Sequence, residues 1–262
     1  MEIAGASSQE VSADDGFTFQ TTLEGRVKAQ ARERSPRRWS VGIGTATPGE
    51  IASLLAFASG EWGPGPFVWV SADAPVTNLL TPEVARCGPQ ALYSAAASLA
   101  GPMALGGGQW AGASMTTTDP VGTTWIAGPK APIPVIPGQP VTVSAYVLGA
   151  NARVRLHWYR ADGTVEPAFV TSQGAGAGGE VRRLHVTATP PAGVVSCTIS
   201  TTRAAQLTRP AATWTDQLFD WHPGEGCQMA VLHGLSRRTL LALRDPAYGR
   251  YSSASFTVTE VG

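Results

Sequence analysis

The stretch TWTDQLFDWHPGEG, residues 213–226, decides how this chain divides, because residues 227–262 still follow it. Its alternating side chains predict the closing strand of a β-sandwich, ended by a turn at Pro223, Gly224 and Gly226. A sandwich that closes there has no place for the remaining residues. We therefore predict that residues 251–262 pair with strands from within residues 17–72, so that one domain is inserted into another.

The composition excludes several classes of function. With 19 Lys+Arg and 19 Asp+Glu, the formal net charge is zero, which argues against electrostatic binding of nucleic acid or of an anionic membrane. No run of about 18 apolar residues predicts a membrane span. Residues 1–15 lack the pattern of a signal peptide, so we expect synthesis in the cytoplasm and a flexible N-terminal arm.

The N-terminal part predicts a β-β-α-β unit. Residues 26–32 and 39–43 alternate between apolar and polar side chains, and we predict that they pair as a hairpin. The tetrapeptide TPGE at 47–50 predicts a helix that starts with a capping box, and Gly60 suits its end. The mostly apolar PFVWVSA at 66–72 predicts the last strand.

From residue 78 to 226 the pattern changes to short strands joined by turns, which favours a two-sheet sandwich of the jelly-roll type. The predicted fold class is therefore mainly β. In the strand 152–160, Val154, Leu156 and Trp158 alternate with polar residues, as one dry and one wet face require. The predicted strands include 141–149, 152–160, 181–190, 193–200 and 212–219.

No motif predicts catalysis. Asp216 and Asp220 are four residues apart on a predicted strand, hence ~13 Å apart. Glycosidase carboxylate pairs lie closer, at roughly 5–9.5 Å. We therefore expect a protein that is not an enzyme and that needs no cofactor.

Exposed aromatic side chains are the remaining candidates, because sugar rings stack on them. The candidates are Trp110, Trp125, Tyr146, Trp158, Tyr159 and Trp214. Trp158 shares its alternation with apolar neighbours and is predicted to lie in the core. Tyr146 and Tyr159 each alternate with the apolar residues of their own strand, so their side chains are predicted to point outward. They are therefore better candidates for a carbohydrate-binding surface, with Trp110 as a weaker one.

Residues 39–83 and 251–262 resemble the distal tail or minor tail proteins of long-tailed bacteriophages of actinobacterial hosts. The resemblance rests on a Trp strand, a capped helix, a Gly-rich turn, Pro-Phe-Val-Trp-Val and Asn-Leu-Leu-Thr-Pro, in that order. The segment from Asn78 to Phe219 is similar to jelly-roll carbohydrate-binding modules.

The resemblance implies a split-barrel, ring-forming domain of residues 1–77 and 227–262, related to the tail-tube fold. It implies that the sandwich of residues 78–226 is inserted into that domain and projects outward. The implied partners are further copies in a homohexamer, the tail tube protein, tail hub or tip proteins and a host cell-wall glycan, all in the virion tail. A stand-alone carbohydrate-binding module without a phage role remains the alternative.

Two further expectations concern single residues. Carbohydrate-binding modules often carry a structural calcium near an Asp of their last strand, and the resemblance places Asp216 at that position. Cys87 and Cys227 flank the predicted insertion, where Asn78 and Gly226 should lie close together, so a disulfide between the two cysteines stays open. Cytoplasmic assembly favours free thiols instead.

Overall fold

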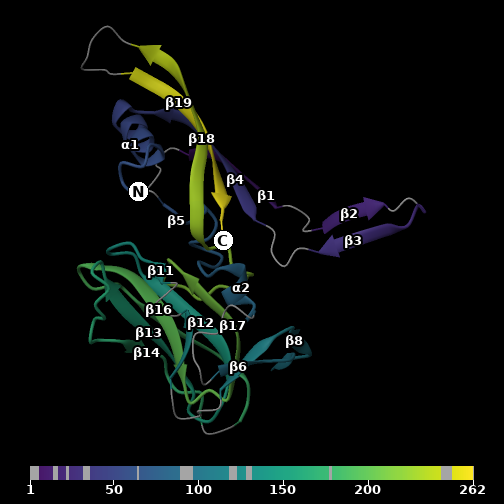
Figure 1. Cartoon of the computed structure of the whole chain (residues 1–262). Coiled ribbons are helices and arrows are strands. Elements are labelled where there is room, and N and C mark those ends of the chain that lie inside the picture. The colour runs from purple at the N-terminus through teal and green to yellow at the C-terminus, as the bar shows by residue number, and fades with distance from the viewer. Residues whose placement is uncertain are drawn as a thin grey trace. The chain divides into compact units, whose positions relative to one another are not determined.

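A computed structural model describes residues 6–13, 17–21, 24–31, 36–63, 65–88, 97–117, 123–127, 132–176, 179–242 and 250–261. The chain folds into two compact units (Figure 1). The first consists of Met1–Trp69 and Gln228–Gly262, and the second of Val70–Cys227. The second unit is thus inserted between two segments of the first.

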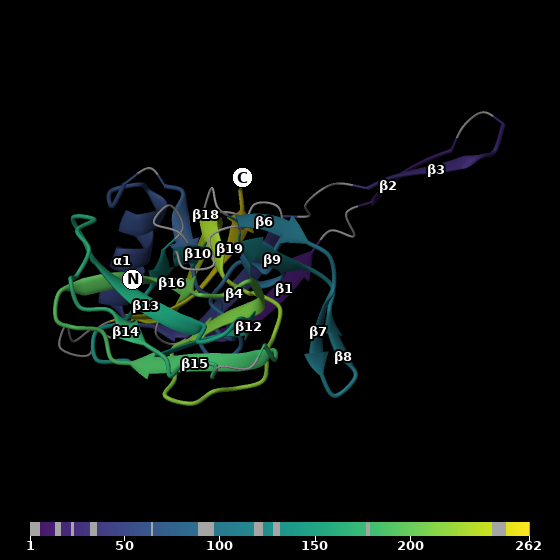
Figure 2. The ribbon, with the colours of Figure 1, turned by 90° about the horizontal axis from the view of Figure 1, so that it is seen from below.

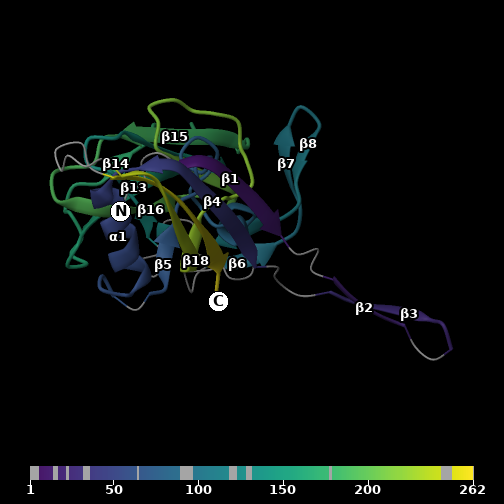
Figure 3. The same cartoon turned by 90° about the horizontal axis from the view of Figure 1, so that it is seen from above.

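The first unit is built on one five-stranded sheet that combines both ends of the chain (Figures 1 and 3). Its order is β1 (Ala6–Ala13), β4 (Arg37–Ala46), β19 (Arg250–Glu260), β18 (Cys227–Ala242) and β5 (Phe67–Trp69). The last strand β19 pairs with β4 in antiparallel register, with Phe256 opposite Val41 and Val258 opposite Trp39. All four of these side chains are buried. The predicted pairing of residues 251–262 with an N-terminal strand is therefore confirmed.

Two predictions about the N-terminal strands are wrong. Part of the predicted flexible arm is strand β1, which pairs with β4 through residues such as Val11, opposite Trp39. The predicted hairpin between 26–32 and 39–43 does not form, because β1 and β19 occupy both edges of β4. Instead β3 (Val27–Ala31) pairs with β2 (Phe17–Thr21) in a two-stranded sheet of their own.

Helix α1 (Pro48–Ala58) begins as predicted. The Thr47 hydroxyl accepts a hydrogen bond from the backbone N–H of Glu50, whose carboxylate accepts one from the backbone N–H of Thr47 at 2.7 Å. The helix ends at the C-cap Ser59, and Gly60 follows with a φ of +81°. Ile51 and Leu54 point into the core of the first unit.

The second unit is a sandwich of two five-stranded sheets (Figure 2). One sheet has the order β10 (Thr123–Ala127), β16 (Val194–Thr202), β13 (Arg153–Arg160) and β14 (Val170–Thr171), with β11 (Ile133–Pro134) also paired to β16. The other has the order β15 (Arg182–Ala188), β12 (Val141–Leu148), β17 (Gln206–Thr213), β9 (Ser114–Thr117) and β6 (Ala97–Ala100). A hairpin of β7 (Met103–Gly106) and β8 (Gln109–Ala111) and the short helix α2 (Pro82–Ala85) complete the unit.

The core of the sandwich lies between its two sheets. It contains Val141, Val143, Ala145 and Val147 from β12, and Val154, Leu156 and Trp158 from β13. Trp158 is 2% exposed, so its predicted place in the core is confirmed. The predicted fold class, mainly β with a sandwich, is confirmed as well.

The stretch 213–226 is not a closing strand. Strand β17 ends at Thr213, and residues 214–226 form an irregular segment. Trp214 pairs with no neighbouring strand that the structure describes. Its backbone N–H donates to the carbonyl of Pro75 and its indole N–H donates to the carbonyl of Pro134, so the chain leaves the sheet here. Farther along, residues 218–220 line a small hollow together with Thr142 and Ser144 of β12.

The two ends of the predicted insertion meet as expected. The backbone N–H of Glu225 donates to the carbonyl of Asn78 at 2.9 Å, and that of Gly226 donates to Leu80 at 2.9 Å. A side chain at position 226 would collide with the backbone of Leu79, so glycine is required there. Among the described residues, no helix has the length and apolar character needed to cross a membrane.

Candidate functional site

The structure separates the three aromatic residues that the sequence favoured. Trp110 lies on β8 and is 62% exposed. Tyr146 lies on β12, half-buried, with the guanidinium of Arg183 5.7 Å from its ring centre. Tyr159 lies on β13 in the opposite sheet. The three residues therefore do not form one surface.

Tyr159 cannot act as a stacking platform, which corrects the prediction. Its side chain is only 8% exposed, and its hydroxyl accepts a weak hydrogen bond from Thr198 at 3.5 Å. The chain after β13 turns back and bridges Tyr159 with Val165, and neighbouring strands bury the ring. Trp214 is also structural, through its bond to Pro134. The side chain of Trp125 lies outside the described part of the chain.

The outer face of strand β13 is polar and carries a different set of residues. Arg153, Arg155, His157 and Tyr159 alternate with the core residues of the strand. Their direct partners on β16 are Thr202, Ser200, Thr198 and Ser196. Residues directly opposite in an antiparallel pair share a face. The alternation in the sequence predicted that this face is wet, but not what covers it.

Phe169 lies against this polar face. Its ring centre is 5.5 Å from that of His157, with 31° between the ring planes, and the guanidinium of Arg155 is 4.8 Å from its centre. Two residues of β13 thus hold the Phe169 side chain, which is still 48% exposed. We call Arg155, His157, Phe169 and Ser200 the Phe169 cluster.

His157 in this cluster is neutral near pH 7. Burial, with a further contribution from the positive charge of Arg155, lowers the pKa of His157 to about 4. Its Nε2 shares a hydrogen bond with the Ser200 hydroxyl at 2.8 Å. Arg155 therefore supplies the charge of the cluster, while the imidazole and the hydroxyl supply neutral hydrogen-bonding groups.

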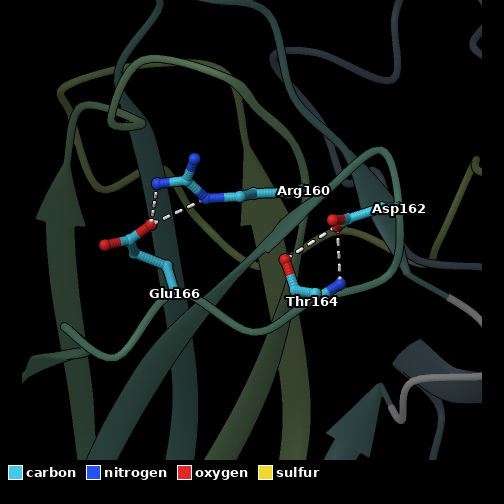
Figure 4. Close-up of polar contacts among 4 residues, drawn as sticks. All are labelled: Arg160, Asp162, Thr164 and Glu166. Carbon is cyan, nitrogen blue, oxygen red and sulfur yellow. Dashed lines mark hydrogen bonds and ion pairs between the residues drawn. The ribbon is translucent and has the colours of Figure 1, made fainter.

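The acidic groups of the turn after β13 have partners within that turn (Figure 4). The guanidinium of Arg160 binds Glu166 through Nη2 at 2.7 Å and Nε at 3.1 Å. Asp162 accepts hydrogen bonds from the backbone N–H and hydroxyl of Thr164, at 2.9 and 2.7 Å, which lower the pKa of Asp162. These contacts stabilise the turn.

The residues present do not fit a calcium site at Asp216. Asp216 and Asp220 are exposed and lie in the irregular segment, so the strand spacing predicted for them does not apply. Calcium needs six to eight oxygen ligands, mostly carboxylates and carbonyls. No group of three or more His, Cys, Asp or Glu side chains that could hold a metal ion occurs among the described residues.

The cysteines are buried thiols. Cys87, Cys197 and Cys227 form no disulfide, so the bond considered between Cys87 and Cys227 is not formed in this structure. Burial raises the pKa of Cys87 to about 12 and also raises that of Cys197. Neither thiol is a nucleophile at neutral pH, because only the thiolate reacts.

The first unit has an apolar hollow of its own, with a volume of about 290 Å³. It lies between the segment around β5 and the strands β18 and β19, and is lined by residues such as Phe57, Phe67, Trp69 and Leu232. Val68, beside it, is 49% exposed. The hollow lacks convergent polar groups, which suits contact with apolar protein surface better than sugar binding.

No family model and no curated protein matches this sequence. Solved structures with some similarity include the enzymatically active domain of tailspike protein 4 of bacteriophage CBA120, with 8% identity over 53% of this chain and 22% of that chain and a TM-score of 0.36. This chain therefore matches about a fifth of that tailspike structure.

Two further structures contain carbohydrate-binding modules. The CBM22-1 and GH10 modules of Clostridium thermocellum endo-1,4-β-D-xylanase 10B, complexed with xylohexaose, show 10% identity over 49% of this chain and 27% of that chain, with a TM-score of 0.33. The module CBM6cm-2 from Cellvibrio mixtus lichenase 5A, in complex with cellotriose, shows 14% identity over 48% of this chain and 93% of that chain, with a TM-score of 0.32. Scores at this level establish neither a common fold nor a common function.

Proposed function

We propose that this protein is a non-catalytic component of the tail tip of a long-tailed phage. In this proposal the first unit takes part in a ring that joins the tail tube to the tip. The second unit presents the Phe169 cluster to sugars of the host cell surface. The observation that carries the proposal is the half-exposed Phe169 ring, held by Arg155 and His157 on a polar sheet face.

The Phe169 cluster has the groups that sugar binding requires. A sugar ring has an apolar face of C–H groups, which packs on an aromatic ring, and a rim of hydroxyls, which needs donors and acceptors. Phe169 offers the first, and Arg155 and His157, which are both partly exposed, offer the second. Because Phe169 is already held in place, binding loses little side-chain entropy.

The tail assignment rests on the segments that resemble distal or minor tail proteins. These segments, residues 39–83 and 251–262, contain β4, α1, β5 and β19, of which the three strands belong to one sheet. A closed ring requires contacts between two different faces of each copy. We propose the apolar hollow near Phe67 and Leu232 as one such face, in a homohexamer that also contacts the tail tube and the hub or tip proteins.

Sugar binding is tested by replacing Phe169. The Phe169→Ala variant should bind immobilised cell-wall polysaccharides of actinobacteria about fivefold more weakly, since an aromatic contact contributes on the order of 1 kcal/mol. Phe219→Ala is the matched control, because Phe219 is 40% exposed and lines the hollow near β12 in the opposite sheet. Equal affinity of both variants and the wild type would remove the Phe169 cluster from the proposal.

The tail role is tested by locating the protein. Light scattering of the purified chain should reveal hexamers in equilibrium with monomers, and labelled antibodies should decorate the tip of intact tails. A monomer that is absent from tails, but still binds sugar through Phe169, would favour the alternative of a stand-alone carbohydrate-binding module.

A further inference from the structure

In the Phe169 cluster, the guanidinium of Arg155 has an N–H group without a hydrogen-bond acceptor among the described residues. The Nε of Arg155 is buried and has no hydrogen-bond partner among the described residues. Its guanidinium packs on the Phe169 ring, which satisfies none of its N–H donors. Because Arg155 as a whole is partly exposed, a ligand reaches the outer N–H groups of its guanidinium rather than the buried Nε, and a ligand that accepts hydrogen bonds suits this arrangement.

A second arginine extends the positive charge along the same face. Arg153 is two residues before Arg155 on β13, so both side chains leave the same side of the strand. Arg153 is exposed, and the structure places no carboxylate against either arginine among the residues that it describes. Two cations therefore lie on one face of β13, Arg153 exposed and Arg155 partly buried under Phe169.

Three acidic residues of the second unit are bound to other groups. Glu166 is paired with Arg160 at 2.7 Å, and Asp162 accepts two hydrogen bonds from Thr164. Glu180 lies 3.5 Å from Arg182. His157 adds no charge at pH 7, because its pKa is lowered to about 4. Among the described residues, the charges of Arg153 and Arg155 are thus not balanced by a carboxylate, even though the whole chain has zero formal net charge.

We propose that the Phe169 cluster selects anionic sugars, in which a carboxylate or phosphate group accompanies the ring. This inference rests on the sugar-binding function proposed above and names the class of ligand. The ring of the sugar stacks on Phe169, and its anionic group accepts charge-assisted hydrogen bonds from Arg155, with Arg153 as a second cation. A neutral sugar provides no negative charge for the guanidinium of Arg155 and binds more weakly.

The test uses ligands that differ only in charge. Trigalacturonate and its full methyl ester have the same rings, and glucose 1-phosphate and glucose form the corresponding phosphate pair. Calorimetric titration of the full chain should give at least tenfold tighter binding of the charged member of one pair. The advantage should shrink as sodium chloride rises from 50 to 500 mM, at roughly constant affinity for the neutral member. The pair that responds distinguishes carboxylated from phosphorylated sugars.

Two charge-removing variants localise the effect. Arg155→Gln should abolish the preference for the charged ligand, whereas Arg238→Gln should keep it, because Arg238 is exposed on β18 of the first unit. Phe169→Ala should weaken both members of the responding pair. If Arg155→Gln unfolds, the ligand pairs and the salt series on the wild type still decide.

The outcomes separate the two proposals. Equal binding of charged and neutral ligands, or binding of neutral cell-wall sugars alone, overturns the anionic preference and leaves sugar binding by Phe169 intact. A preference that survives in Arg155→Gln overturns the assignment of Arg155. Absence of binding to these ligands and to a panel of neutral and acidic cell-wall polysaccharides overturns both.

Discussion

The side-chain oxygen of Asn78 accepts a hydrogen bond from the backbone N–H of Ala212 at 3.1 Å. It also accepts one from Leu80 at 3.1 Å, while the amide nitrogen donates to the carbonyls of Pro210 at 3.2 Å and His222 at 3.0 Å. One fully buried amide thus satisfies both its donors and its acceptor while joining three segments of the second unit.

We predict that Asn78→Leu destabilises the protein by about 3 kcal/mol or more, because it leaves buried backbone groups of β17 and its neighbours without partners. Guanidinium unfolding, followed by tryptophan fluorescence, measures the change. Gln217→Leu is the control, since Gln217 is exposed, and it should stay within about 0.5 kcal/mol of the wild type. A small effect at Asn78 would mean that water replaces the amide.

In the first unit, Arg37 of β4 binds Glu260 of β19 through Nε at 3.0 Å and Nη2 at 3.2 Å. The Glu260 side chain is only 3% exposed. Glu260→Gln should therefore destabilise the first unit by roughly 3 kcal/mol, since it leaves a largely buried guanidinium without its counter-charge. The exposed pair Arg26–Glu24, 4.0 Å apart, is the control, and Glu24→Gln should change stability by less than about 0.5 kcal/mol. Thermal unfolding compares the two; equal shifts would contradict this prediction.

The buried thiols predict a loss of stability at high pH. The pKa of Cys87 is raised from 9.0 to about 12, so the unfolded chain releases this proton before the folded chain does. The stabilisation by the buried Cys87 thiol is complete below pH 9 and is lost as pH rises toward 12, by about 1.4 kcal/mol per pH unit. Urea unfolding between pH 8 and 11 should show this slope, and Cys197→Ala should make it shallower. If the pH dependence of Cys197→Ala equals that of the wild type, groups other than this thiol cause the loss of stability.

His157 predicts a loss of stability at low pH. Its pKa is lowered from 6.5 to about 4, so below pH 6.5 the unfolded chain binds this proton more readily. The contribution of neutral His157 to the free energy of unfolding is complete above pH 6.5 and is lost as pH falls to about 4. Unfolding of His157→Gln should depend less on pH over this window than that of the wild type. His185, exposed on β15, is the matched site, and His185→Gln should keep the wild-type dependence.

Binding of a neutral or carboxylated sugar should respond little to pH from 8 to 5.5, because His157 stays neutral throughout. A phosphorylated sugar is excluded from this test, because its phosphate gains a proton near pH 6. Binding of the best sugar ligand, measured by calorimetry at several pH values, checks this. An affinity that rises tenfold toward pH 5.5 would show that the imidazolium takes part in binding.

The sequence by itself determined the elements whose causes are local. The start of α1 depends on groups three residues apart, Thr47 and Glu50, and their capping box formed as predicted. The polar and apolar faces of β13 follow from the alternation of side chains along one strand. The same alternation in residues 251–260 demanded a partner strand, and β4 supplies it.

Only the tertiary structure decided the choices that depend on distant segments. The alternation in 213–219 resembles a strand, but the bonds of Trp214 to Pro75 and Pro134 take the chain off the sheet. Residues 27–31 form a strand as predicted, yet its partner changed because β1 and β19 had filled both edges of β4.

The candidate site belongs to this second class. The alternation of side chains predicted that Tyr159 lies on the polar face of β13, but neighbouring segments bury it. Phe169, which no sequence pattern indicated, lies over Arg155 and His157. The exposure of an aromatic ring depends on which side chains pack on it. Here the contacts join Phe169 to residues of another strand, His157 and Arg155, which are more than ten positions away in sequence. The sequence thus determined which side chains face solvent or core along each strand, and the packing of separate segments determined which of them form a surface.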